Sequence, residues 1–184
     1  MHIETFVNTT SRAWAIPILA KLHAGVAGRQ APLLAATGAS RTAFVQSMNH
    51  LISMGFLERN PGYGHPLRPE FRLTTLGASA ADIASKIHSV TAEKDQDLLR
   101  RAWTLPVLAV IDRSHNFNEI KRNLQRITDR ALSQSLKMME VRSWVERRVD
   151  VTARPPRSIY RAVNTGGLIS SIAASEIRFN TSAP

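Results

Sequence analysis

The chain has 184 residues and a formal net charge of +10, because 24 Lys and Arg stand against 14 Asp and Glu. Cysteine is absent, which excludes disulfides, thiolate zinc sites and thiol redox switches. No apolar run approaches the ~20 residues of a membrane span, and the first residues lack the basic and apolar regions of a signal peptide. We therefore expect a soluble cytoplasmic protein. Its basic charge either serves solubility alone or suits a polyanion such as nucleic acid.

The sequence contains two copies of one pattern. Residues 12–19 (Arg-Ala-Trp-Ala-Ile-Pro-Ile-Leu) return 89 residues later, at 101–108, as Arg-Ala-Trp-Thr-Leu-Pro-Val-Leu. Two further blocks, which contain Gln46 and Phe71, return in the same order 88 and 89 residues later. A repeat of this length is a whole small domain, too long for one unit of a solenoid. We therefore expect two domains of one kind.

In the first copy, the pattern predicts three helices followed by a hairpin. Ser11, Pro32 and Ser40 can each begin a helix, as an N-cap or as a first-turn proline. A glycine follows the second helix and another follows the third, as expected of C-caps. The predicted elements are helices at 12–24, 32–37 and 41–54, hairpin strands at 56–60 and 70–74, and a wing tip at 61–69.

Residues 78–100 join the copies. This stretch contains no glycine or proline, and apolar residues recur along it. We expect one or two helices here, which fix the geometry between the copies better than a flexible linker would.

The second copy repeats the plan more clearly. Apolar residues at helical spacing predict three helices, and Thr128 is suited to cap the third. Alternating residues on either side of a loop that contains Pro155 predict two strands. The predicted elements are helices at 102–112, 117–124 and 129–142 and strands at 144–149 and 158–163.

Three helices followed by a hairpin are the plan of a winged helix-turn-helix. The expected fold class is therefore mainly α with small β-hairpins (α+β). The predicted domains are a first winged-helix domain at 1–77, a helical connector at 78–100, and a second winged-helix domain with a C-terminal helix at 101–184.

Several blocks of the second copy form a recognisable series. They are Phe-Asn-Glu-Ile-Lys at 117–121, Ile-Thr-Asp-Arg at 127–130 and Val-Glu-Arg-Arg-Val at 145–149. In this order they resemble the HxlR-type branch of the MarR-like winged-helix transcription regulators, over nearly all of 100–165. The first copy is similar more loosely, for example at Gly55–Arg59.

The resemblance implies sequence-specific binding of double-stranded DNA in the cytoplasm, at the nucleoid, and favours repression over activation. Family members resemble one copy and dimerise through terminal helices, so two copies in one chain depart from the pattern. The functional unit is then either one chain acting as a pseudo-dimer or a homodimer. In a homodimer, residues 1–10 and 167–177 can supply the contact between chains.

The third helix of each copy can enter a major groove, where base edges carry a distinct code of donors and acceptors. In the second copy, Arg130 can pair with guanine and Gln134 with adenine, while Lys137 suits phosphate. The third helix of the first copy carries fewer charged residues on this face. The alternative interpretation for both helices is a solvated face without DNA contact, which would carry similar polar residues. The wings add backbone contacts and salt dependence. The candidates for DNA contact are Ser40, Arg41, Thr42, Gln46, Asn49 and Arg68 in the first copy, and Thr128, Arg130, Ser133, Gln134, Lys137, Arg148, Arg154 and Arg157 in the second.

Other classes of function find less support. The six histidines show no metal-ligand spacing, and no nucleophile motif or phosphate loop appears, so we expect no enzyme, metal or cofactor. Trp14 and Trp103 can line a pocket for a small-molecule effector or simply anchor the core, and the chain can also have no effector. The main alternative is a protein-interaction module in which one or both copies have lost DNA binding. The lack of an aromatic platform argues against single-stranded RNA.

Overall fold

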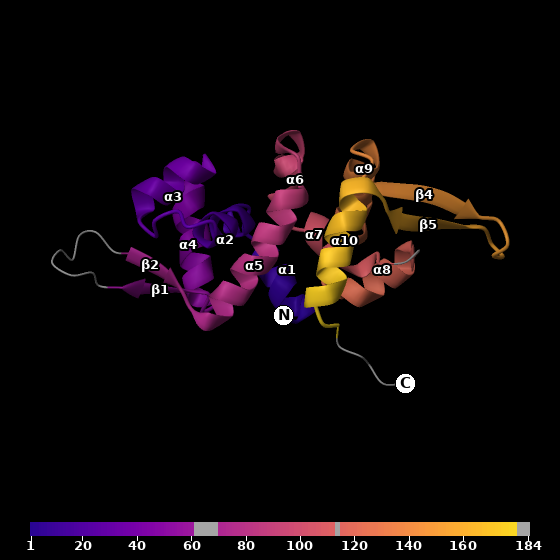
Figure 1. Cartoon of the computed structure of the whole chain (residues 1–184). Helices are drawn as coiled ribbons and strands as arrows, with labels where there is room; N and C mark the ends of the chain where they lie inside the picture. Colours follow the sequence, from indigo (N-terminus) through magenta and orange to yellow (C-terminus); the bar gives the residue numbers. More distant parts are fainter. Residues whose placement is uncertain (61–69, 113–114, 180–184) are drawn as a thin grey trace.

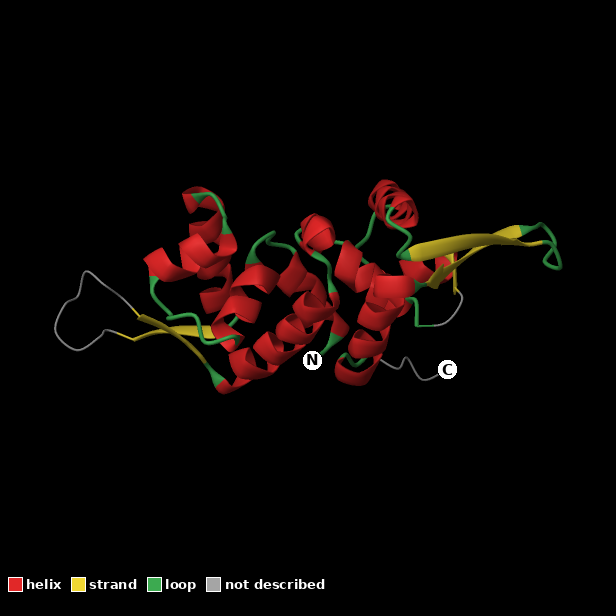
Figure 2. Ribbon diagram, turned by 45° about the horizontal axis from the view of Figure 1, so that its top comes forward, coloured by secondary structure: helices red, strands yellow, loops and turns green. Residues whose placement is uncertain are grey.

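The computed structural model describes residues 1–60, 70–112 and 115–179, which form a mainly helical molecule with small antiparallel hairpins (Figures 1 and 2). The predicted fold class, mainly α with β-hairpins, is confirmed. In chain order the elements are α1 (Ile3–Thr10), α2 (Ala15–His23), α3 (Gln30–Thr37), α4 (Arg41–Ser53), β1 (Leu57–Asn60), β2 (Glu70–Leu73), α5 (Thr75–Val90), the 3-10 helix η1 (Glu93–Asp95), α6 (Gln96–Leu99), α7 (Thr104–Val110), β3 (His115–Asn116), α8 (Phe117–Leu124), α9 (Asp129–Val141), β4 (Val145–Asp150), β5 (Arg157–Ala162) and α10 (Asn164–Glu176).

Local signals set most of these bounds. The hydroxyl oxygen of Ser40 accepts a hydrogen bond from the Ala43 N–H at 3.4 Å, and that of Thr128 accepts one from the Ala131 N–H at 3.2 Å. Both predicted N-caps are therefore confirmed, and each begins the third helix of its copy. Gly55 follows α4 with φ +71°, a left-handed conformation that glycine adopts without strain.

The start of the chain differs from the prediction. Residues 3–10 form the helix α1, and Ser11 ends this helix instead of capping the next one. The Ser11 hydroxyl donates to the Asn8 carbonyl at 2.6 Å, so it faces back along α1. Helix α2 begins only at Ala15, without a side-chain cap.

Small differences also occur in the second copy. Helix α7 is shorter than the predicted helix, and the short strand β3 was not predicted. In the three-stranded sheet, of order β3-β5-β4, His115 pairs with Tyr160 and Asn116 with Ile159. A strand of this length carries too little pattern to recognise in a sequence.

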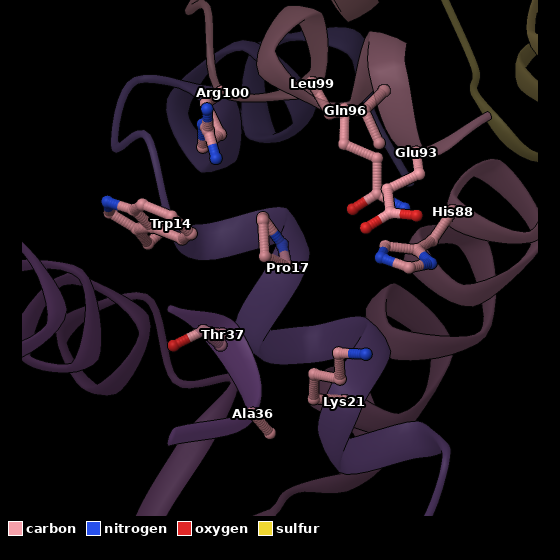
Figure 3. Close-up of a pocket in the computed structure, with 10 residues that line it drawn as sticks. All are labelled: Trp14, Pro17, Lys21, Ala36, Thr37, His88, Glu93, Gln96, Leu99 and Arg100. Carbon is pink, nitrogen blue, oxygen red and sulfur yellow. The ribbon is translucent and has the colours of Figure 1, made fainter. Parts of the chain in front are cut away.

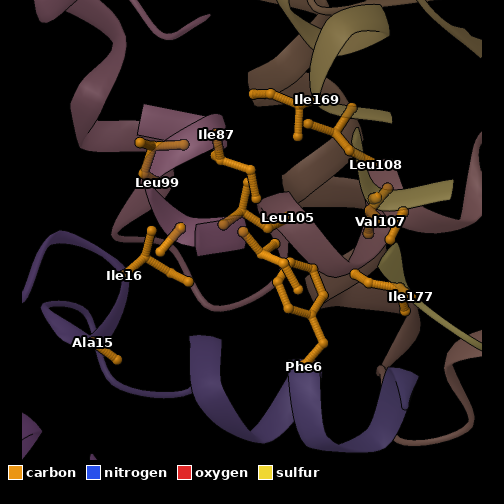
Figure 4. Packing of buried hydrophobic residues seen from close by; sticks show 14 of the residues in the cluster. Phe6, Ala15, Ile16, Ile87, Leu99, Leu105, Val107, Leu108, Ile169 and Ile177 are labelled. Atoms are coloured by element: carbon orange, nitrogen blue, oxygen red, sulfur yellow. The ribbon is translucent and has the colours of Figure 1, made fainter. Parts of the chain in front are cut away.

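The two halves of the chain share one hydrophobic core. Helix α2 packs against α5, α7 packs against α10, and α5 and α10 also pack against each other in the middle of the molecule (Figure 1). The buried cluster includes Phe6, Ile16 and Ile87 from the first half and Leu105 and Ile169 from the second (Figure 4). No break in apolar packing separates the two copies at this junction.

Polar contacts reinforce the junction. Helix α1 belongs to the first half but contacts α7, and the Thr10 hydroxyl donates to the Ala102 carbonyl at 2.8 Å. The N-terminal ammonium donates to the Glu176 carbonyl at 2.7 Å. On the surface, the Lys86 ammonium lies 2.8 Å from the Glu176 carboxylate, which ties α5 to α10. Residues 1–10 and 167–177, considered above for contacts between chains, thus pack largely within one chain.

Two glycines at repeat-related positions show how closely each hairpin approaches its following helix. A Cβ added to Gly77 would lie 1.8 Å from the Phe56 carbonyl oxygen, and one added to Gly166 would lie 2.1 Å from that of Trp144. Such distances leave no room for any side chain. By contrast, a Cβ at the adjacent Gly167 would meet its nearest atom at 3.6 Å, which is ordinary contact.

We expect Gly77→Ala and Gly166→Ala each to lower the free energy of unfolding by about 1–3 kcal/mol, because backbone must move to admit the methyl group. Gly167→Ala serves as the matched control, and it should be neutral or slightly stabilising because alanine favours the helix. Urea denaturation of the three variants measures the difference. Equal stability of Gly166→Ala and Gly167→Ala would contradict the close approach.

Candidate nucleic-acid interface

Helix α9 separates a buried side from a polar side. Leu132, Leu136 and Met139 point into the core and are buried. Their spacing of four and three residues follows the helical period, which places the remaining positions on the outer face. The exposed side chains there include those of Arg130, Ser133, Gln134 and Lys137, which are all predicted candidates.

The first turn of α9 is anchored to the preceding helix. Besides the cap by Thr128, the Lys121 ammonium of α8 lies 2.6 Å from the Asp129 carboxylate. Asp129 is also favourably placed at the positive end of the helix dipole. The Thr128 oxygen is engaged as a cap, and its exposed hydroxyl hydrogen remains a possible donor.

The last turn of α9 is anchored by Arg142, which the sequence did not single out. Its guanidinium donates to the Asp95 carboxylate at 2.5 Å and to the Lys94 carbonyl at 3.0 Å, and it lies 3.3 Å from the carboxylate of Asp97. Asp95, and then Asp97, raise the pKa of Arg142 above its ordinary value. Asp95 is buried, so this contact between α9 and the η1–α6 segment is more than a solvated surface pair.

The wing of the second copy presents several arginines. Strands β4 and β5 pair from Val145 opposite Ala162 to Asp150 opposite Arg157. The turn between them is shaped by Asp150, whose carboxylate accepts from the Thr152 hydroxyl and backbone N–H at 2.6 and 2.9 Å. These bonds hold the pKa of Asp150 below its ordinary value.

The wing arginines differ in how free they are. Arg154 and Arg157 are exposed near the tip. Arg148 is also exposed, but its guanidinium lies 3.1 Å from the Glu146 carboxylate. Arg147 donates twice to the Ser158 hydroxyl oxygen, at 3.0 and 2.8 Å, which keeps it along the strands.

Helix α4 of the first copy repeats this arrangement with less charge. Phe44, Met48 and Leu51 are buried, and the opposite face exposes the predicted candidates. Those candidates are Arg41, Thr42, Gln46 and Asn49, and the capping Ser40 is also exposed. The same face exposes the apolar Val45. Arg68, predicted in the wing of this copy, lies outside the described residues.

The two wings lie at opposite ends of the molecule, with α5 and α10 between them (Figures 1 and 2). Within the described ranges there is no group of three or more His, Asp or Glu side chains suited to a metal ion. Nor does any helix in those ranges have the length and apolar character needed to cross a membrane.

Comparison with known proteins bears on the second half of the chain. Neither the curated proteins nor the solved structures give a significant match. The model of the HxlR-like helix-turn-helix family matches residues 98–177, a range that contains α7 to α10 and both strands of the second wing. The match supports an HxlR-type helix-turn-helix, characteristic of DNA-binding transcription regulators and not of enzymes, in this half of the chain.

Proposed function

We propose that the protein is a transcription regulator that reads double-stranded DNA with α9, supported by the wing of β4 and β5. The observation that carries the proposal is the exposed face of Arg130, Gln134 and Lys137 on a helix anchored at both ends. A helix held in this way loses little freedom on binding, so less of the contact energy is spent on ordering it.

Some residues of α9 are suited to contact bases, and others are suited to contact the DNA backbone. Arg130 lies near the N-terminal end of the helix, which is the end that contacts base edges in helix-turn-helix proteins. Its guanidinium can donate twice to guanine, and the Gln134 amide can both donate to and accept from adenine. Lys137 lies one turn further on and is suited to phosphate.

The wing supplies backbone contacts. Arg154 and Arg157 are exposed and lie at the end of the hairpin, away from the core. Arg148 contributes less, because its ion pair with Glu146 must first be broken or shared. These contacts add affinity that depends on salt but not on sequence.

Helix α4 extends the proposal to a second, unlike half-site. Its polar face offers Gln46 and Asn49 for adenine, and its first turn offers Arg41. Since both copies share one core, one chain can act as a pseudo-dimer and present two different reading helices. Occupation of a promoter by this unit would repress transcription by exclusion. A protein partner is the alternative occupant of α4, favoured by its exposed Val45 and low charge.

Fluorescence anisotropy with the protein's own upstream DNA and with random duplex tests the role of α9. Arg130→Ala should weaken the binding free energy for the preferred duplex by about 1–3 kcal/mol, because a base contact is lost. The preference for that duplex over random DNA should fall as well. Lys137→Ala should lower the affinity of the protein for both duplexes by the same factor. Arg178→Ala is the matched control, since it removes one exposed charge that follows α10 and belongs neither to a proposed reading helix nor to a wing. If the wild type binds neither duplex at low salt, DNA binding is ruled out and a protein partner becomes the leading function.

The contribution of the wing can be measured from the salt dependence of the DNA-binding constant. Each phosphate contact contributes roughly −0.9 to the slope of log Kobs against log salt, so Arg154→Ala/Arg157→Ala should make this slope shallower by about 2. The preference between duplexes should stay the same. Arg148→Ala should change the slope by less than about 1, because Glu146 already competes for this arginine. An unchanged slope in the double variant would show that the wing does not touch DNA.

A further inference from the structure

Helices α4 and α9 correspond residue by residue. Each has 13 residues, and every position of α9 lies 88 residues after its equivalent in α4. The N-caps Ser40 and Thr128 are equivalent, and each accepts a hydrogen bond from the backbone N–H of an equivalent alanine. The buried apolar side chains are equivalent as well, namely Phe44, Met48 and Leu51 in α4 and Leu132, Leu136 and Met139 in α9. The outer faces of the two helices can therefore be compared position by position.

Four pairs of exposed, equivalent positions make up the two outer faces. They are Thr42 and Arg130, Val45 and Ser133, Gln46 and Gln134, and Asn49 and Lys137. Glutamine occupies the third position in both helices, so each presents the same amide there. These four positions carry no cation in α4 and two cations in α9. The two helices thus share one polar group and differ in what surrounds it.

Val45 serves no purpose in the core of the protein. It is 38% exposed and takes no part in the hydrophobic cluster, whereas the neighbouring Phe44 is 1% exposed. Valine is also less favourable in a helix than alanine, because its branched side chain loses rotamer freedom. Residues three and four positions apart are neighbours on a helix, so Val45 lies between Thr42 and Asn49. It therefore places an apolar group among polar neighbours.

An apolar side chain on such a face has a specific partner in the major groove. Thymine carries a 5-methyl group there, and apolar side chains pack against it. The Gln46 amide matches the acceptor and the donor of adenine. Since adenine pairs with thymine, Val45 and Gln46 favour the same kind of sequence. By contrast, the Arg130 guanidinium in α9 matches the two acceptors of guanine.

We propose that α4 selects a half-site of A·T pairs in which Val45 contacts the 5-methyl group of thymine, whereas α9 selects a half-site with a guanine at Arg130. Gln46 and Gln134 read adenine at equivalent positions, so the two half-sites share one base and differ beside it. This inference rests on the proposed DNA binding by both helices and defines the sequences that they select.

The packing between the halves makes the sequence at α4 matter for the whole chain. Helix α2 packs against both α4 and α5. At the N-cap of α2, the centre of the Trp14 ring lies 4.7 Å from the guanidinium of Arg100, the residue that follows α6 (Figure 3). Arg142, at the end of α9, donates to Asp95, just before α6. When α9 binds DNA, α4 is therefore held near the same duplex, and an unfavourable sequence there lowers the affinity.

Deoxyuridine tests the contact of Val45, because it pairs as thymidine does and lacks only the 5-methyl group. The duplex is the protein's own upstream DNA, and hydroxyl-radical footprinting defines its protected segments. Deoxyuridine then replaces every thymidine in one segment or in the other. In one of the two segments, this replacement should lower the affinity of the full chain by about fourfold, the effect of one buried methyl group. In the other segment it should leave the affinity unchanged.

Two variants assign this difference to Val45. Val45→Ala and Val45→Ser should each bind the thymidine and deoxyuridine duplexes with equal affinity, because the apolar contact is lost. Since Val45 is exposed, both variants should fold, and urea denaturation checks their stability. Leu76→Ala is the matched control, because it removes an exposed apolar side chain from the first turn of α5. This control should keep the fourfold difference.

The guanine contact of α9 has an equivalent test. In 7-deazaguanine, the N7 acceptor that Arg130 would meet is replaced by a C–H group. In the segment that does not respond to deoxyuridine, this base should lower the affinity roughly tenfold, because a hydrogen bond to a charged group is lost. Arg130→Ala should remove that difference. Unchanged affinity of the wild type would overturn the guanine contact.

The remaining outcomes separate this inference from the proposed function. Equal affinity of the wild type for the thymidine and deoxyuridine duplexes would overturn the thymine contact. A fourfold difference that both Val45 variants retain would overturn the role of Val45. Protection of a single segment would overturn DNA reading by α4 and leave a protein partner as its occupant. If the wild type binds no duplex at low salt, the proposed function itself fails.

Discussion

The two halves of the chain bury apolar surface against each other along α5 and α10, and this packing fixes the positions of α4 and α9, the two helices proposed to read DNA. Helix α2 packs between α5 and the helices α3 and α4, and α7 packs between α10 and the helices α8 and α9. The crossing of α1 onto α7, with the Thr10 to Ala102 hydrogen bond, adds a second contact between the halves. A continuous core resists relative motion of its parts, because interiors are close-packed and separation would expose apolar side chains.

Because one core joins both halves, the two proposed reading helices are held in one chain and need not be identical. In a symmetric dimer each surface appears twice, so both halves must read the same sequence. In one chain the two halves can differ: the outer face of α9 carries the cations Arg130 and Lys137, whereas that of α4 carries Arg41 beside mostly amide and hydroxyl groups. Under our proposal, the second half of the chain contributes most of the DNA affinity, and the first half contributes a second reading surface.

The parts of the structure that depend on short-range rules could be predicted from the sequence. The caps at Ser40 and Thr128, the glycine after α4 and both hairpins follow from residues a few positions apart. The predicted reading faces are exposed for the same reason, because their buried partners recur at the helical period. Arg142 could not be identified, since its partners Asp95 and Asp97 lie far away in the sequence and meet it only through the fold. Helix α1 was missed because its stability comes from packing against α2 and α7.

We propose that one chain is a complete DNA-reading unit with two unlike reading helices. Its most direct test combines sedimentation equilibrium of the complex on a selected duplex with hydroxyl-radical footprinting. We expect one chain of 20.4 kDa per duplex and two protected segments of different sequence. The segments should be separated by about one helical turn or a multiple of it. Two chains on a palindromic site, or protection of a single segment by one chain, would contradict it.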